Sequence, residues 1–174
     1  MRTDAELVKA CLDGEKEAFG TLVERYERPV RAIALGILRD YHIVGDVSQE
    51  SFVAAYQKLS GLRKAEAFGP WLMKITRRCA LDTVKRRTRR ASLDSAINVA
   101  AESTDGRLDE DKQRLLAAVM KLPRGERQVV MLRYFSGCGV RDVSDIVGRS
   151  VGTVTKQLSR AHKRLRRLLK EFER

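Results

Sequence analysis

Apolar residues recur every three or four positions along most of the chain, which is the spacing of one face of an α-helix. A first helix is predicted to begin after Thr3, because Thr3 and Glu6 have the spacing of a capping box. Apolar positions at helical spacing then fill residues 16–26. Pro29 is expected to break or kink the chain before a further helix at 30–38.

Two longer helical patterns follow, at 43–59 and 68–87, so the first part of the chain is predicted to contain four or five packed helices. Phe68 and Trp71 fall on the apolar stripe of the second pattern. We therefore assign them to the core, with stacking on an unpaired base as the alternative. A helix is also predicted at 112–121.

The end of the chain has the pattern of a helix-turn-helix. An apolar stripe at 140–147 is followed by a turn at Gly148 and by a long helix from residue 151 onward. Many helical hairpins that do not bind DNA share this pattern, so it indicates a fold more than a function. The predicted fold class is all-α.

Charge divides the chain into three parts. The 174 residues include 35 Lys and Arg and 23 Asp and Glu, for a net charge of +12. Residues 1–90 carry +6, residues 91–110 carry −4 and residues 111–174 carry +10. The middle part is rich in Ser, Ala and Asp and has no aromatic residue. We therefore predict two small helical domains, 1–90 and 111–174, joined by a flexible acidic linker at 91–110.

Two runs of basic residues indicate an anionic partner. Residues 156–170 contain seven basic side chains and no acidic one, and residues 74–90 contain eight basic side chains against Asp82 alone. A helix face that is merely solvated usually alternates Glu with Lys. The basic excess therefore favours nucleic acid as the partner of both domains.

Several motifs occur in an order that resembles one protein family over nearly the whole chain. Residues 45–52 (GDVSQESF) contain D-x-x-Q-E-x-F, and residues 68–75 (FGPWLMKI) precede a basic run at 85–87. The C-terminal half has Leu-Pro at 122–123, Leu-Arg at 132–133 and V-G-T-V at 151–154. This ordered set resembles the small, two-domain bacterial sigma factors of the extracytoplasmic-function type.

The resemblance implies a transcription initiation factor that binds core RNA polymerase, through its β′ coiled coil and β flap, and promoter DNA. It implies that the 1–90 domain binds polymerase and melts the minus-ten element, while the 111–174 domain reads the minus-thirty-five element as duplex. An anti-sigma factor is a possible further partner. The polymerase-binding candidates are Asp46, Gln49, Glu50 and Phe52.

Positions i, i+3 and i+4 share one helix face, so Asp46, Gln49 and Glu50 are expected to form one acceptor patch. The candidates for minus-ten contacts are basic: Arg63, Lys64, Lys74, Arg77, Arg78, Lys85 and Arg86. The candidates for minus-thirty-five contacts surround the start of the last helix, where short or polar side chains suit base edges. They are Arg149, Ser150, Thr153, Thr155, Lys156, Gln157 and Arg160.

Two other function classes remain open. A stand-alone helix-turn-helix regulator would bind duplex DNA without polymerase, which would leave the motif at 45–52 without a purpose. An enzyme would need a catalytic constellation, but His42 and His162 are isolated from carboxylate clusters and from each other.

The three cysteines are widely spaced and form no CxxC, so no cofactor or metal is predicted. No apolar run approaches the ~18–20 residues of a membrane span, so we expect a cytoplasmic protein without membrane contact of its own.

Overall fold

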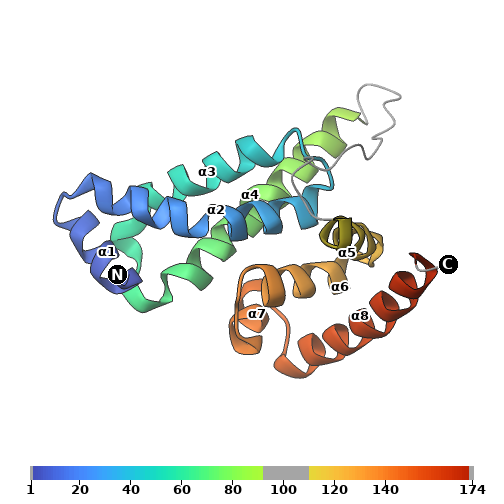
Figure 1. Ribbon diagram of the computed structural model, residues 1–174. Coiled ribbons are helices and arrows are strands. Elements are labelled where there is room, and N and C mark those ends of the chain that lie inside the picture. Colours follow the sequence, from blue (N-terminus) through green and yellow to red (C-terminus); the bar gives the residue numbers. More distant parts are fainter. Residues whose placement is uncertain (1, 92–109, 173–174) are drawn as a thin grey trace.

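The computed structural model describes residues 2–91 and 110–172. Helices α1 to α4 form a first lobe, and helices α5 to α8 form a second (Figure 1). The first lobe consists of α1 (Asp4–Leu12), α2 (Lys16–Leu38), α3 (Val44–Gln57), the 3₁₀ turns η1 (Leu59–Gly61) and η2 (Ala65–Ala67), and α4 (Phe68–Ala91). The second consists of α5 (Glu110–Lys121), α6 (Arg124–Val130), the short π-helix η3 (Met131–Phe135), α7 (Val140–Val147) and α8 (Val151–Phe172).

Every regular element in the described ranges is helical, which confirms the all-α prediction. Residues 92–109, which include nearly all of the predicted linker, lie outside the described residues. Of the described helices, none is long and apolar enough to cross a membrane.

The predicted break at Pro29 is wrong, because α2 continues through Pro29 from Lys16 to Leu38. A proline inside a helix removes one hydrogen bond and costs roughly 3 kcal/mol. The residues that follow it offset this cost, since Val30, Ile33 and Leu35 are all buried. Each fully buried aliphatic side chain contributes about 1.5–3 kcal/mol.

The core of the first lobe is built around Phe68, the first residue of α4, whose side chain is fully buried. Its ring contacts those of Phe19, Tyr26 and Trp71, with ring centroids 6.5, 5.5 and 5.9 Å away. The pairs with Phe19 and Tyr26 are edge-to-face, and such pairs at these distances stabilise a core beyond their buried area. The assignment of Phe68 to the core is therefore confirmed, and α4 is held against α2 at its first turn.

Tyr26 links three elements of this lobe. Its hydroxyl donates a hydrogen bond to a carboxylate oxygen of Asp4 in α1. Gly69 in α4 lies so close that a Cβ there would be 2.7 Å from the Tyr26 hydroxyl oxygen. Burial, followed by the bond to Asp4, raises the pKa of Tyr26.

We expect Tyr26→Phe to lower the free energy of unfolding by about 1–2 kcal/mol, because Asp4 loses a partly buried donor. Urea denaturation of the full chain measures the change. Tyr56→Phe is the matched control, since the Tyr56 side chain is 46% exposed. Equal stabilities of the two variants would contradict the role given to the Tyr26 hydroxyl.

The second lobe contains the predicted helix-turn-helix. Helix α7 ends at Val147 and is capped by Gly148, which has φ +67° and donates its N–H to the Ser144 carbonyl. This left-handed conformation favours glycine and turns the chain into α8. Buried side chains of α6, α7 and α8, among them Val129, Val143 and Val154, pack together beneath the turn. The start of α8 is thereby held outward.

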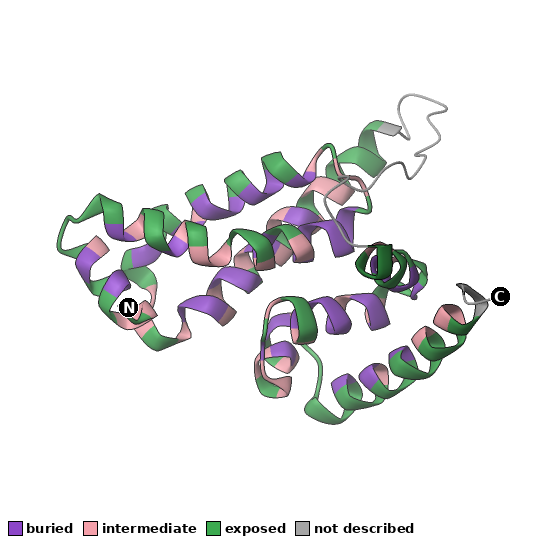
Figure 2. Ribbon diagram, in the orientation of Figure 1, coloured by how far each residue is buried: buried purple, intermediate pink, exposed green. Residues whose placement is uncertain are grey.

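The two lobes contact each other, which the sequence did not predict. The C-terminal half of α2 packs against α6 and η3, and α4 packs against α7. Residues 33–38 at the end of α2 are all buried, and Figure 2 colours the end of this helix accordingly.

Candidate functional site

The acceptor patch predicted on α3 is present at the surface. Asp46, Gln49 and Glu50 are exposed on this helix, and Asp46 lies in its first turn. Phe52 differs from these three, because only 8% of its side chain is exposed and it packs into the core. The three polar side chains are therefore accessible, whereas Phe52 supports the helix that carries them.

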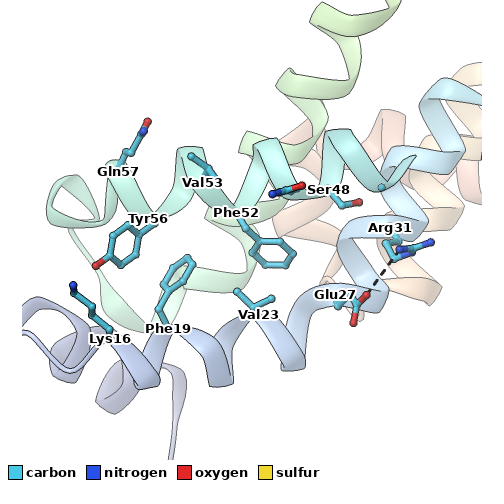
Figure 3. Close-up of a pocket in the computed structure, with 12 residues that line it drawn as sticks. Lys16, Phe19, Val23, Glu27, Arg31, Ser48, Phe52, Val53, Tyr56 and Gln57 are labelled. Atoms are coloured by element: carbon cyan, nitrogen blue, oxygen red, sulfur yellow. Dashed lines mark ion pairs between the residues drawn. The ribbon is translucent and has the colours of Figure 1, made fainter. Parts of the chain in front are cut away.

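An apolar groove between α2 and α3 borders this patch (Figure 3). Phe19 and Val23 from α2 and Phe52, Val53 and Tyr56 from α3 line it, and Gln49 lies beside them. The Val53 and Tyr56 side chains are 49% and 46% exposed. The Tyr56 ring packs edge-on against the Phe19 ring, with the two ring centroids 4.9 Å apart. Aromatic side chains in an exposed groove are typical of protein-binding surfaces.

The sequence pattern does not reveal this groove. Phe19, Val23 and Tyr56 fall on the apolar stripes of the helical patterns at 16–26 and 43–59. Periodicity shows that an apolar side chain lies on a given face, but it does not show whether a neighbouring helix covers that face completely. Val53 was the available indication, because it is apolar and lies off the buried face of α3.

Helix α4 carries a basic surface next to the acceptor patch. Arg78 and Lys85 are 82% and 81% exposed, and both lie near Asp82, at 3.9 and 3.8 Å. Arg86 pairs with Glu50 across the two helices at 3.4 Å. Exposed ion pairs of this kind contribute at most about 1 kcal/mol. These three basic side chains are therefore available to another anion.

The other four minus-ten candidates lie toward the second lobe. Arg63, Lys64 and Lys74 line a pocket together with Trp71, and Asp142 and Asp145 of α7 line its other side. Trp71 is half-buried, so its ring serves the core and also reaches this pocket.

Arg77 is half-buried between the lobes. Among the described residues, its Nε has no hydrogen-bond partner. Burial, followed by the charges of Arg124 and Arg149, lowers the pKa of Arg77. Of the seven candidates Arg77 is the half-buried one, whereas Lys74 also lines a second pocket together with Trp71 and Arg78.

The helix-turn-helix presents most of its predicted residues together. Arg149, Ser150, Thr153, Thr155, Lys156 and Arg160 are all exposed around the start of α8. The Ser150 and Thr153 hydroxyls are 2.9 Å apart, and Ser150 also accepts from the Thr153 N–H at 3.3 Å, which caps the helix. Gln157 is different, because its side-chain nitrogen lies 2.7 Å from where a Cβ on Gly125 would be. Gln157 therefore packs against α6.

Helix α8 is anchored to α6 by an ion pair. Arg164 Nε lies 2.9 Å from the Glu126 carboxylate of α6, and only 9% of the Glu126 side chain is exposed. The remaining basic side chains on this part of α8, including Lys156, Arg160 and Lys163, are exposed. The described residues contain no group of His, Cys, Asp or Glu suited to hold a metal ion.

An exposed, basic helix-turn-helix joined to a helical lobe with an exposed apolar groove is the arrangement expected of a DNA-binding transcription protein. Family models agree with this class. The model for sigma-70 region 2 matches residues 22–90, and the model for sigma-70 region 4 matches residues 112–165. The chain belongs to the sigma-70 family of RNA polymerase sigma factors, in its extracytoplasmic-function group. Members of this family are transcription initiation factors and not enzymes.

Individual relatives cover most of the chain. SigW, an extracytoplasmic-function sigma factor of Bacillus subtilis, is 24% identical over 95% of this chain and 96% of its own length. The probable sigma factor RfaY of Xanthomonas campestris is 33% identical over 92% of this chain, which spans 42% of RfaY. The structure of CnrH in complex with the cytosolic domain of CnrY is 27% identical, with a TM-score of 0.71 and 97% of each chain covered. The sigma factor RpoE of Bartonella quintana, in complex with the anti-sigma factor NepR, has the same fold, with a TM-score of 0.76 at 24% identity over 87% of this chain and 96% of that chain.

Proposed function

We propose that this chain binds core RNA polymerase through α3 and the adjoining groove, and that its two lobes then divide promoter recognition between them. The observation that carries the proposal is the position of three separate surfaces on two lobes. An acceptor patch with an apolar groove lies on α3, a basic surface lies on α4, and a second basic surface lies at the start of α8. One protein partner and two DNA elements account for all three.

The α3 surface suits a protein more than DNA. The carboxylates of Asp46 and Glu50 repel phosphate, while they accept hydrogen bonds from arginine side chains well. The neighbouring Val53 and Tyr56 offer the apolar contact that protein interfaces bury at their centre. The resemblance to extracytoplasmic-function sigma factors implies that this partner is the β′ coiled coil of RNA polymerase. It also implies that the β flap contacts the helix-turn-helix lobe.

The two basic surfaces suit two states of DNA. The start of α8 offers hydroxyl, amine and guanidinium groups on an exposed helix, which fits the major groove of duplex DNA. Helix α4 offers Arg78, Lys85 and Arg86, and Trp71 lines a pocket with Arg78. A combination of cations and an aromatic ring suits an unpaired strand. We therefore assign the minus-thirty-five element to α8 as duplex and the minus-ten element to α4 as it melts.

A protein inhibitor is the further partner that this proposal includes. The CnrH chain matches this chain over 97% of its length, and CnrH forms a complex with the cytosolic domain of CnrY. The groove between α2 and α3 is available for such a partner, because its apolar side chains are exposed. An inhibitor bound there would compete with polymerase for the same surface.

Reconstitution with purified core RNA polymerase tests the proposal. We expect a stable 1:1 complex on gel filtration and transcripts from a subset of fragments in a genomic DNA library. A stand-alone regulator would bind DNA fragments without forming the complex, and this outcome would overturn the proposal. Core polymerase alone, incubated with the same library, is the control.

A further inference from the structure

Gln157 of α8 lies on the helix face that is proposed to meet duplex DNA, but its side chain turns away from that face. It is half-buried, whereas the other six minus-thirty-five candidates are exposed. Thr153 precedes it by four residues and Arg160 follows it by three, so all three start from the same side of the helix. Its spacing alone would therefore let Gln157 reach a base, and its conformation prevents this.

The amide of Gln157 occupies a notch at the start of α6, which exists because residue 125 is a glycine. Gly125 is the second residue of α6. A Cβ there would lie 2.7 Å from Nε2 and 3.7 Å from Cδ of Gln157. Real Cβ atoms essentially never approach another heavy atom within 3.0 Å. Gln157 can therefore hold this position only while residue 125 has no side chain.

Packing, and not a hydrogen bond to its oxygen, holds the Gln157 amide in the notch. The side-chain oxygen is buried, and none of the described residues donates a hydrogen bond to it. A buried acceptor without a donor is unfavourable, so the amide is easily displaced. A methyl group at position 125 would displace it and spare Arg149, whose Nη1 would be at an ordinary contact distance of 3.9 Å from the new Cβ.

Helices α6 and α8 are tied together beside the notch. Glu126, the neighbour of Gly125, pairs with Arg164 Nε at 2.9 Å, and only 9% of the Glu126 side chain is exposed. The two helices also pack directly on each other, with Val129 and Leu158 buried. Binding of DNA to the exposed face of α8 should therefore leave the notch intact.

We propose that Gly125 is a positioning residue for promoter specificity: it keeps the Gln157 amide against α6, so that Gln157 reads no base. Selectivity for the duplex then comes from the exposed side chains around the start of α8. The inference rests on the proposed function, because it concerns the same DNA-binding surface. A displaced Gln157 would turn toward the major groove, where a glutamine amide matches N6 and N7 of adenine.

Gly125→Ala tests the inference, with Gly20→Ala as its matched control. Holoenzyme containing the full chain is mixed with variants of a promoter recovered from the genomic library, in which each base pair upstream of the opened region is replaced in turn. Sequencing of the bound DNA gives the base preferences. We expect Gly125→Ala to gain about a tenfold preference for adenine at one position. Alanine favours helix over glycine, and a Cβ at Gly20 meets nothing within 4 Å, so Gly20→Ala should match the wild type.

Gln157→Ala shows whether the new preference arises from the displaced amide. Alone, it should leave the base preferences of the wild type unchanged. Combined with Gly125→Ala, it should remove the new adenine preference. The inference would be overturned if Gln157→Ala alone changed a base preference, or if the gain in Gly125→Ala persisted without Gln157. A merely structural effect of Gly125→Ala would weaken binding to all sequences equally, and this outcome would overturn it too.

The position of Gln157 can also be measured without DNA. In the full chain, the side-chain amide protons of Gln157 should show a nuclear Overhauser effect to the α protons of Gly125, and its absence would contradict the inference. Failure of the proposed function would look different. Wild-type holoenzyme would then bind all promoter variants equally and yield no transcripts, while the Overhauser effect would still be present.

Discussion

The double variant Asp46→Lys/Glu50→Lys is expected to bind core RNA polymerase about 100-fold more weakly than the wild type. Both carboxylates are exposed on α3 beside the apolar groove, so reversal places two cations where the partner is expected to present its own. Removing a charge pair from an interface costs roughly 2–5 kcal/mol, and about 2.7 kcal/mol corresponds to a factor of 100. Fluorescence titration of labelled protein with core polymerase measures the loss.

Two controls separate this effect from others. Glu24→Lys reverses an exposed charge of α2 outside the residues that line the groove, and it should leave the affinity unchanged. Arg86→Ala removes the ion-pair partner of Glu50, so it shows whether the loss arises from that pair. Unaltered affinity of the double variant, with normal helicity by circular dichroism, would remove α3 from the polymerase-binding surface.

The elements of this fold could be predicted from the sequence because their signals are local. The capping box is present as read, with the Glu6 N–H bonded to the Thr3 hydroxyl at 3.3 Å and the Thr3 N–H bonded to Glu6 at 2.6 Å. The turn at Gly148 and the exposure of Asp46, Gln49 and Glu50 followed from spacing alone. Each of these features depends on residues within a turn or two of one another.

The features that were missed depend on contacts between distant segments. Pro29 is a strong local break, and only the burial of the residues after it shows why α2 continues. The inter-lobe contact left one trace, the apolar run at 32–38, which has no polar face and so suits a helix covered on all sides.

Individual DNA-binding candidates also needed the structure. Gln157 has the spacing of a base-reading residue, but it packs against Gly125. Arg77 belongs to a basic run, but it lies half-buried between the lobes. The sequence gives the charge of a side chain and the helix face on which it lies. It does not show which distant segment of the chain covers that side chain.

The two basic surfaces are expected to fail at different steps of initiation, and the structure selects the variants that test this. Lys156→Ala/Arg160→Ala removes two exposed cations from the start of α8. At roughly 1–3 kcal/mol for a good base contact, we expect a loss of about 10–100-fold in promoter location by the holoenzyme. A gel shift on a promoter recovered from the genomic library measures it. Strand opening on the DNA that does bind should persist.

Arg78→Ala/Lys85→Ala should have the converse effect. Both side chains are more than four-fifths exposed and pair only loosely with Asp82, so the lobe should fold normally. Separating DNA strands costs about 1.4 kcal/mol per base-pair step, and contacts to the opened strand must offset that cost. We therefore expect the holoenzyme to locate the promoter while permanganate reactivity of thymines in the bubble falls severalfold. If the α4 pair abolished location and the α8 pair abolished only opening, the assignment of the two DNA elements to the two lobes would be reversed.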